Sequence, residues 1–122
     1  MFLLQQCPKS IESQCMDMME SKYKFYLSFE NSVCKDYVTE KFFKVLNYNL
    51  IPIVLGGANY SKFAPSKSYI NVRDFQSIGQ LAEYLNYLDK NETAYAEYFE
   101  WKNYFRVVVD FKNIFCHVCQ VI

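Results

Sequence analysis

Six polar side chains lie close together in the sequence and have the types that bind a phosphorylated sugar. They are Asn31, Ser32, Tyr37, Thr39, Glu40 and Lys41. Where a helix begins, unpaired backbone N–H groups favour an anion such as phosphate, and Lys41 adds a full positive charge. The Glu40 carboxylate can accept hydrogen bonds from two vicinal hydroxyls, such as those of a ribose. These residues predict a site for a sugar nucleoside diphosphate; the alternative is that Glu40 and Lys41 are helix formers on a solvated face.

One βαβ unit over residues 23–57 is expected to position these side chains at the carboxyl edge of a sheet. Residues 24–29 are rich in aromatic and aliphatic side chains, which is typical of a strand, and residues 51–55 form the aliphatic run of a strand buried in a parallel sheet. Between them a helix is predicted to begin near Asp36 or Tyr37, with Asp36 as its cap. The apolar face of that helix is Val38, Phe42, Val45 and Leu46.

The second half of the chain is expected to add a strand and two helices. Residues 58–67 are predicted as a loop and residues 68–72 as a third strand. Ser77 and Gln80 fit a capping box that begins a helix, which is predicted to end at residues 89–91. Its apolar stripe is Ile78, Leu81, Leu85 and Leu88, and its solvated side is Glu83, Asn86 and Asp89.

An aromatic face follows on the second of these helices. It consists of Tyr95, Tyr98, Phe99, Trp101 and Phe105, with Glu97, Glu100 and Lys102 on the solvated side. Exposed rings could stack on carbohydrate, but a stripe at helical spacing more often packs into a core. We therefore interpret these rings as core.

Charge and length exclude several classes of function. Thirteen basic and thirteen acidic residues balance, so no field attracts nucleic acid or an anionic membrane. No stretch approaches the ~20 apolar residues of a membrane span, and no signal peptide or anchor is visible. A length of 122 residues suits one domain, assigned to residues 23–122. Residues 1–22 are predicted as an irregular lead-in that contains Cys7 and Cys15, with a short helix through Met16, Met19 and Glu20.

Five cysteines in so short a chain indicate an oxidising compartment. Cys7 and Cys15 are a plausible local disulfide. The pair Cys116 and Cys119 fits a redox pair, half of a zinc site or a disulfide anchor. A zinc site would need two further ligands, and the single histidine, His117, lies inside the pair where it is poorly placed to close the tetrahedron.

Two segments match the acceptor pattern for N-linked glycosylation. Asn91-Glu92-Thr93 lies in a polar break between helical stretches, where a glycan can project. Asn59-Tyr60-Ser61 directly follows a predicted buried strand. Asn91 is therefore the preferred candidate.

Several linked blocks resemble the donor-binding signature of the α1,3/α1,4-fucosyltransferases. The blocks are residues 29–32, 36–41, 51–60, 68–72, 74–75, 81–85, 98–102 and 116–119. The resemblance covers the chain from about Tyr23 to its end. It implies a Rossmann-like parallel sheet with flanking helices, similar to the carboxyl-terminal half of a two-Rossmann-domain (GT-B-type) glycosyltransferase.

This resemblance implies inverting transfer of fucose from GDP-fucose to N-acetylglucosamine of a glycan, in protein glycosylation. In the family the carboxyl-terminal domain holds the donor, and the other domain holds the acceptor and supplies the base. Lys41 matches the diphosphate contact and Glu40 the ribose contact. Asn31 and Tyr37 match residues that make polar contacts to the phosphate and sugar of the donor, and Glu30 and Ser32 are secondary candidates.

No residue of the chain matches the family's catalytic base or its diphosphate-binding arginine, so no catalytic residue is assigned. No motif requires a divalent metal or a tightly bound cofactor. We expect the chain alone to be an incomplete, inactive enzyme whose acceptor is held by an amino-terminal domain. The alternatives are a fragment that binds GDP or GDP-fucose without turnover, and a disulfide-rich lumenal interaction domain.

The resemblance also implies a place in the Golgi lumen or membrane. In the family, paired cysteines at the carboxyl end help to tie together the ends of the catalytic domain. Cys116 and Cys119 are therefore expected to pair locally or with Cys7 and Cys15.

Overall fold

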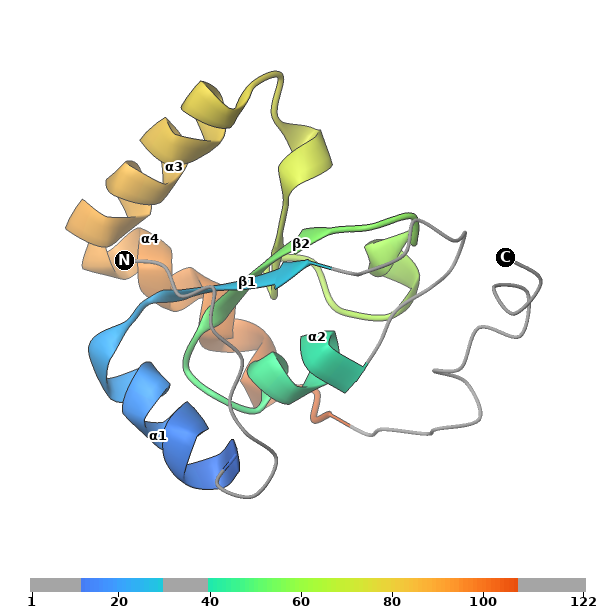
Figure 1. The fold of residues 1–122 in the computed structure, drawn as a ribbon, viewed down its shortest axis with the longest axis vertical. Helices are drawn as coiled ribbons and strands as arrows, with labels where there is room; N and C mark the ends of the chain where they lie inside the picture. The colour runs from blue at the N-terminus through green and yellow to red at the C-terminus, as the bar shows by residue number, and fades with distance from the viewer. Residues whose placement is uncertain (1–11, 30–39, 108–122) are drawn as a thin grey trace.

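Three parallel strands form the sheet of the protein (Figure 1). The computed structural model describes residues 12–29 and 40–107 of the chain. The strands are β1 (Phe25–Phe29), β2 (Ile51–Leu55) and β3 (Ile70–Asn71), in the order β1-β2-β3. In the register, Leu27 lies opposite Ile53, which lies opposite Ile70. The predicted α/β class with a parallel sheet is confirmed.

Strand β2 lies in the middle of the sheet and is buried on both faces. Its Ile51, Ile53 and Val54 are fully buried, as the uninterrupted aliphatic run predicts. Strand β3 is shorter than the predicted residues 68–72. The chain turns into a 3₁₀ helix, η3 (Val72–Asp74), where the Asn71 side chain accepts a hydrogen bond from the Arg73 N–H at 3.0 Å.

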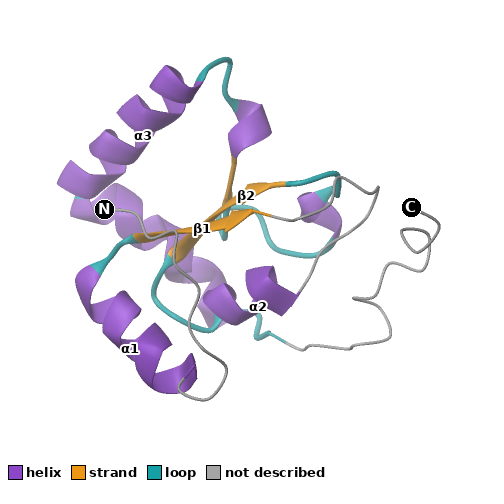
Figure 2. Cartoon of the chain, in the orientation of Figure 1, coloured by secondary structure: helices purple, strands orange, loops and turns teal. Residues whose placement is uncertain are grey.

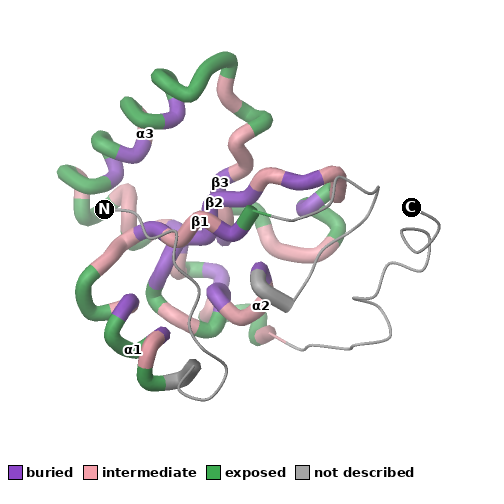
Figure 3. The backbone as a smooth tube through the Cα atoms, in the orientation of Figure 1, coloured by how far each residue is buried: buried purple, intermediate pink, exposed green. Residues whose placement is uncertain are grey.

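Helices cover both faces of the sheet (Figures 1 and 2). Helix α2 (Glu40–Leu46) connects β1 to β2 and packs its Phe42 and Leu46 with Val54 on one face. Helix α3 (Ile78–Lys90) packs on the other face. There its leucines at 81, 85 and 88 meet the apolar side chains of all three strands. Figure 3 shows the buried residues gathered along the sheet and on the helix faces turned toward it.

Helix α1 (Glu12–Lys22) packs beside α2. Met16 and Met19 are buried together with Val45 and Leu50. The expected short helix through the two methionines is present, so residues 12–22 are helical rather than irregular. The division between lead-in and domain at residue 22 stays a prediction.

The start of α3 departs from two details of the sequence prediction. The Ser77 hydroxyl accepts from the Gln80 N–H at 3.1 Å, as in a capping box, but the Gln80 side chain accepts from the Gln76 N–H at 3.0 Å instead of from Ser77. Ile78, predicted to be buried, is 69% exposed. The first turn of α3 lies away from the three strands, so no sheet surface is there to cover it (Figure 1).

The predicted aromatic helix consists of two parts, α4 (Glu92–Ala96) and a 3₁₀ helix, η4 (Glu97–Asn103). Tyr98 and Trp101 are buried, which confirms the core interpretation for these rings. Phe105 is 59% exposed, because it lies beyond the end of η4 where helical spacing no longer sets its direction.

Candidate functional site

The carboxyl ends of β1 and β2 lie side by side and form the edge at which the polar stretch was predicted. Phe29, the last residue of β1, is paired with Leu55, the last residue of β2. Gly56 therefore follows β2 at the same edge of the sheet at which β1 ends. Helix α2 returns from this edge, so its first turn begins beside the strand ends (Figure 1). Ligands of open α/β folds bind at such an edge.

The structure locates the predicted donor-binding residues only in part. Glu40 and Lys41 form the beginning of the described part of α2, at the carboxyl edge. The other four, Glu30, Asn31, Ser32 and Tyr37, lie outside the described residues, as does the predicted helix start near Asp36. The contacts assigned to all six side chains stay predictions.

Ser28 is a polar residue at this edge that was not singled out from the sequence. It is 2% exposed, and its Oγ makes no hydrogen bond to any of the residues that the structure describes. Its neighbour across the sheet is Val54, which packs with α2, so the hydroxyl lies on the α2 face two residues before Glu30. A buried unpaired hydroxyl costs about 1–3 kcal/mol. A single serine in the otherwise apolar strand FYLSF is the signal that could have drawn attention to it.

Three aromatic rings attach the loop after β2 to the first turns of α2. Phe42 contacts Tyr60 with a centroid distance of 5.3 Å and Tyr69 at 5.8 Å, both edge to face, and Tyr60 and Tyr69 also meet at 5.8 Å. Tyr60 lies in a short 3₁₀ helix, η2 (Tyr60–Lys62), inside the predicted loop, and it is 1% exposed. Burial raises the pKa of Tyr69, and Asp74 adds to that shift. Edge-to-face pairs add about 0.5–1.5 kcal/mol each beyond area burial, so this cluster fixes the loop relative to α2.

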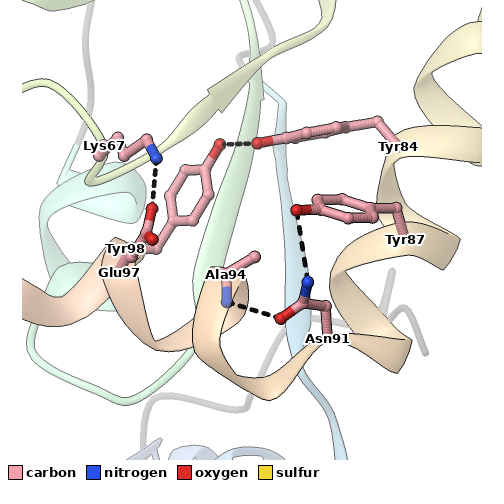
Figure 4. Close-up of polar contacts among 7 residues, drawn as sticks. All are labelled: Lys67, Tyr84, Tyr87, Asn91, Ala94, Glu97 and Tyr98. Carbon is pink, nitrogen blue, oxygen red and sulfur yellow. Dashed lines mark hydrogen bonds and ion pairs between the residues drawn. The ribbon is translucent and has the colours of Figure 1, made fainter.

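An ion pair fixes the far end of the same loop to η4 (Figure 4). Lys67 has φ 54°, in the left-handed region, and its Nζ lies 2.6 Å from Glu97 Oε2. This hydrogen bond and charge raise the pKa of Lys67. The ammonium also lies 5.9 Å from the centre of the Tyr98 ring, whose hydroxyl is 2.6 Å from that of Tyr84. Burial raises the pKa of Tyr98, and the hydrogen bond to Tyr84 raises it further.

The amino edge of the sheet, by contrast, is occupied by packing contacts. Lys24 Nζ lies 3.1 Å from Asp89 Oδ1 and donates to the Asp89 carbonyl at 2.9 Å. The Tyr95 hydroxyl donates to the Lys24 carbonyl at 2.9 Å, and burial raises the pKa of Tyr95 to about 12. These contacts tie the α3–α4 corner to the start of β1.

Lys102 contributes to the same edge and corrects the prediction that it lies on a solvated side. Its Nζ donates to the Tyr48 carbonyl at 3.0 Å and to Asn49 Oδ1 at 3.2 Å, and it lies over the rings of Phe99 and Trp101. Partial burial lowers its pKa, with an opposing contribution from the charge of Glu20. The long side chain lies along the aromatic surface and leaves its ammonium among oxygens.

The described ranges contain one disulfide-bonded cysteine, and neither a cluster of metal ligands nor a membrane-spanning helix. Within residues 12–29 and 40–107, no group of three or more His, Cys, Asp or Glu side chains is placed to hold a metal ion. None of the helices in those ranges is long and apolar enough to cross a membrane. Cys15 is disulfide-bonded. The other four cysteines, at positions 7, 34, 116 and 119, lie outside the described residues, so the predicted pairings stay predictions.

Comparison with known proteins decides the family. Residues 4–122 match the model of the glycosyltransferase family 10 (fucosyltransferase) carboxyl-terminal domain. The chain belongs to this fucosyltransferase family. The resemblance predicted from the sequence is confirmed, and the carboxyl edge just described is that of a fucosyltransferase carboxyl-terminal domain.

Relatives of this fucosyltransferase chain are much longer. It is 44% identical over 121 residues to glycoprotein 3-alpha-L-fucosyltransferase A of Drosophila melanogaster, covering 95% of this chain and 23% of that protein. It is 42% identical over 120 residues to an alpha-(1,3)-fucosyltransferase of Caenorhabditis elegans, covering 90% of this chain and 28% of that one. The chain therefore spans about a quarter of the length of these relatives.

Solved structures of α1,3-fucosyltransferase share the fold. One matches 80% of this chain and 27% of its own with a TM-score of 0.62 and 31% identity. A structure of α1,3-fucosyltransferase with GDP-fucose matches 76% of this chain and 26% of its own, with a TM-score of 0.61 and 32% identity. The fold is thus shared with an enzyme observed with this sugar nucleotide.

Proposed function

We propose that this chain is the GDP-fucose-binding half of an α1,3-fucosyltransferase that acts in protein glycosylation. The full enzyme would transfer fucose, with inversion, to N-acetylglucosamine of a glycan. The observation that carries the proposal is the family match over residues 4–122 together with the likeness to an α1,3-fucosyltransferase with GDP-fucose. A glycan acceptor is supported by the name of the Drosophila relative, a glycoprotein fucosyltransferase.

GDP would bind at the carboxyl edge, beside the first turn of α2. Lys41 would contact the diphosphate and Glu40 the ribose, while Asn31 and Tyr37 would contact the phosphate and sugar. Glu30 and Ser32 are secondary contacts in the same stretch. The position of residues 40–41 at the strand ends supports this assignment, because a ligand at the edge of the sheet would lie against them.

The chemistry of the donor half is stabilisation of a leaving group. As the bond between fucose and GDP breaks, negative charge develops on the diphosphate while the sugar gains oxocarbenium character. A cation placed at the diphosphate stabilises that charge more in the transition state than in the bound donor, so it accelerates departure. Lys41 would provide this cation.

The acceptor half would come from a separate amino-terminal domain. The acceptor hydroxyl must be deprotonated as it attacks the anomeric carbon, and no residue of this chain is assigned as that base. Loss of one general base costs about 10²–10⁴ in rate, and loss of acceptor positioning forfeits part of the ~7–11 kcal/mol available from holding two substrates in register. The chain by itself is therefore expected to bind donor without useful transfer.

A paired binding and transfer assay tests this proposal. The purified chain is titrated with GDP-fucose by calorimetry and then incubated with labelled GDP-fucose and a panel of N-acetylglucosamine-containing glycans, whose masses are followed. We expect saturable binding and at most a trace of transfer. Robust transfer would mean that a base is present in this chain, with Glu30 the first residue to mutate. Absence of binding would instead favour a lumenal interaction domain that has kept only the fold.

The family match also supports a place in the Golgi lumen or membrane. The disulfide at Cys15 supports an oxidising compartment. Disulfides that involve Cys7, Cys116 and Cys119 would tie the two ends of the chain to the domain.

A further inference from the structure

The glycosylation pattern Asn91-Glu92-Thr93 lies at an outer corner of the fold, which the donor site does not use. Asn91 ends α3 and begins α4, so the chain turns there. Glu92 and Thr93 are exposed, and Asn91 is half-buried. An accessible turn with a short polar side chain is a position where a large modification can project without disturbing the core.

The carboxamide of Asn91 is held in one orientation by both of its ends (Figure 4). Its Oδ1 accepts from the Ala94 N–H at 3.0 Å and so caps α4. Its Nδ2 therefore points away from α4, toward the Tyr87 hydroxyl at 3.4 Å. An amide nitrogen carries two hydrogens, so a sugar can replace one while the other remains a donor. Glycosylation at Nδ2 is thus compatible with the cap.

The Tyr87 ring of α3 lies beside that nitrogen and is backed by two further rings. Tyr87 is 51% exposed and stacks on Tyr84, with centroids 6.1 Å apart and planes at 29°. Tyr84 in turn contacts Phe75 at 5.6 Å. Tyr84 and Phe75 are half-buried against the core, so Tyr87 is the exposed member of the three rings. An exposed aromatic ring with a hydroxyl at its edge suits a ligand that is partly apolar and partly polar, such as a sugar.

We propose that Asn91 carries an N-linked glycan whose first N-acetylglucosamine lies against Tyr87. The bond from Nδ2 to the sugar's C1 forms as the C1–O bond to a lipid-linked pyrophosphate breaks. The pyrophosphate leaves with the lipid, and Nδ2 loses one proton. The inference rests on the lumenal location proposed above, because that donor class is used in the secretory pathway.

The second pattern, Asn59-Tyr60-Ser61, is less suited to a glycan. The Ser61 hydroxyl already donates a hydrogen bond to Asn59 Oδ1 at 2.6 Å. The central residue of the pattern, Tyr60, is buried. A glycan there would also project from the carboxyl edge, beside the proposed donor site. The geometry therefore selects Asn91 over Asn59.

Three variants test which asparagine is used. The 122-residue chain is secreted from eukaryotic cells, and its mass and peptide map are compared before and after treatment with a peptide N-glycosidase. Asn91→Asp keeps a capping oxygen and Thr93→Ala keeps Asn91, yet each is expected to lose one glycan. Ser61→Ala is the matched control and is expected to keep it. A secreted wild-type chain with unmodified Asn91, or a loss of the glycan only in Ser61→Ala, would overturn the proposal.

Titration of the same samples with GDP separates the glycan at Asn91 from the proposed donor site. Binding of GDP by a chain with unmodified Asn91 would overturn only the glycan. A modified Asn91 in a chain that does not bind GDP would overturn only the donor site.

A second measurement tests the contact with Tyr87. The glycan is trimmed with an endoglycosidase that leaves one N-acetylglucosamine, and the Tm is compared with that of Thr93→Ala. We expect the single sugar to raise Tm by about 2–4 °C, the size of one modest surface contact in a chain of this length. The same comparison in a Tyr87→Ala background should show no difference. A rise of equal size in that background would overturn the stacking contact.

Discussion

The contacts proposed for Glu40 and Lys41 can be separated by experiment. Lys41 would contact the diphosphate through its charge, whereas Glu40 would accept hydrogen bonds from the hydroxyls of the ribose. The two residues are adjacent in α2, so a general disturbance of the helix would affect both contacts equally. Ligands that lack one group at a time can therefore distinguish a contact from a structural effect.

Glu40→Gln is predicted to weaken binding of GDP more than binding of 2′-deoxy-GDP. In the proposed site the Glu40 carboxylate would accept hydrogen bonds from ribose hydroxyls, and one of these hydroxyls is already missing in the deoxy ligand. A hydrogen bond to a charged group contributes about 1.5–3 kcal/mol, so the loss on GDP should be roughly tenfold or more. Calorimetric titration of both ligands into both proteins measures it. Equal losses on the two ligands would rule out the ribose role.

The strand and helix that flank the polar stretch could be predicted from the sequence, but contacts between distant residues could not. The stretch before Lys41 indicates a ligand by its side-chain types and by its place after a strand, and that role stays a prediction. The pair of Lys67 and Glu97 joins residues thirty positions apart, and nothing local in the sequence indicates it. The buried hydroxyl of Ser28 was overlooked for a similar reason, since its burial depends on α2.

At the scale of elements, α4 is held to the sheet by Tyr95. The ring packs edge to face on Phe25 at 5.9 Å, and its hydroxyl donates to the carbonyl of Lys24. Because ionisation would place a charge in this partly buried position, the pKa of Tyr95 is raised from 10.0 to about 12.

The free energy of unfolding is predicted to fall between pH 10 and 12. In that window the unfolded chain has released the Tyr95 proton while the folded chain retains it, so the unfolded state binds fewer protons and stability decreases as pH rises. Below pH 10 the contribution is complete. Urea unfolding measured across this pH range should show the free energy of unfolding falling with pH in the wild type. The fall should be less steep in Tyr95→Phe. Identical slopes would show that Tyr95 ionises alike in both states.

Helix patterns predicted packing well where the sheet extends beneath the helix. Leu81, Leu85 and Leu88 are buried as their spacing predicts, because strands lie opposite them. Ile78 fits the same stripe but lies beyond the sheet, and periodicity carries no information on where a sheet ends. The change from α4 to a 3₁₀ helix was likewise not predictable, since the rings of η4 satisfy either spacing.

In the whole molecule, the described residues form a three-stranded parallel sheet covered by helices, and the chain spans about a quarter of the length of its relatives. We propose that its carboxyl edge binds the donor. Acceptor binding is therefore proposed for a part of the enzyme outside these 122 residues.

Secretion is predicted to leave Cys116 and Cys119 without free thiols and the protein without stoichiometric zinc. Both cysteines would be oxidised in the lumen, and the neighbouring His117 cannot complete a zinc site with them. Thiol labelling followed by intact mass, together with elemental analysis, measures this. Two free thiols at these positions, or one zinc per chain, would contradict the disulfide anchor.

The central claim, that the carboxyl edge binds GDP-fucose through its nucleotide, is tested most directly by calorimetric titration of GDP into three proteins. These are the wild type, Lys41→Ala, and the control Lys90→Ala, which removes an equal charge from the exposed end of α3 on the other face of the sheet. We predict that Lys41→Ala weakens binding by about 1.5–3 kcal/mol, or roughly ten- to a hundredfold, while Lys90→Ala leaves the Kd unchanged. A folded Lys41→Ala protein that binds GDP as tightly as the wild type would contradict the account. Lys41 would then be a helix former on a solvated face without a role in binding.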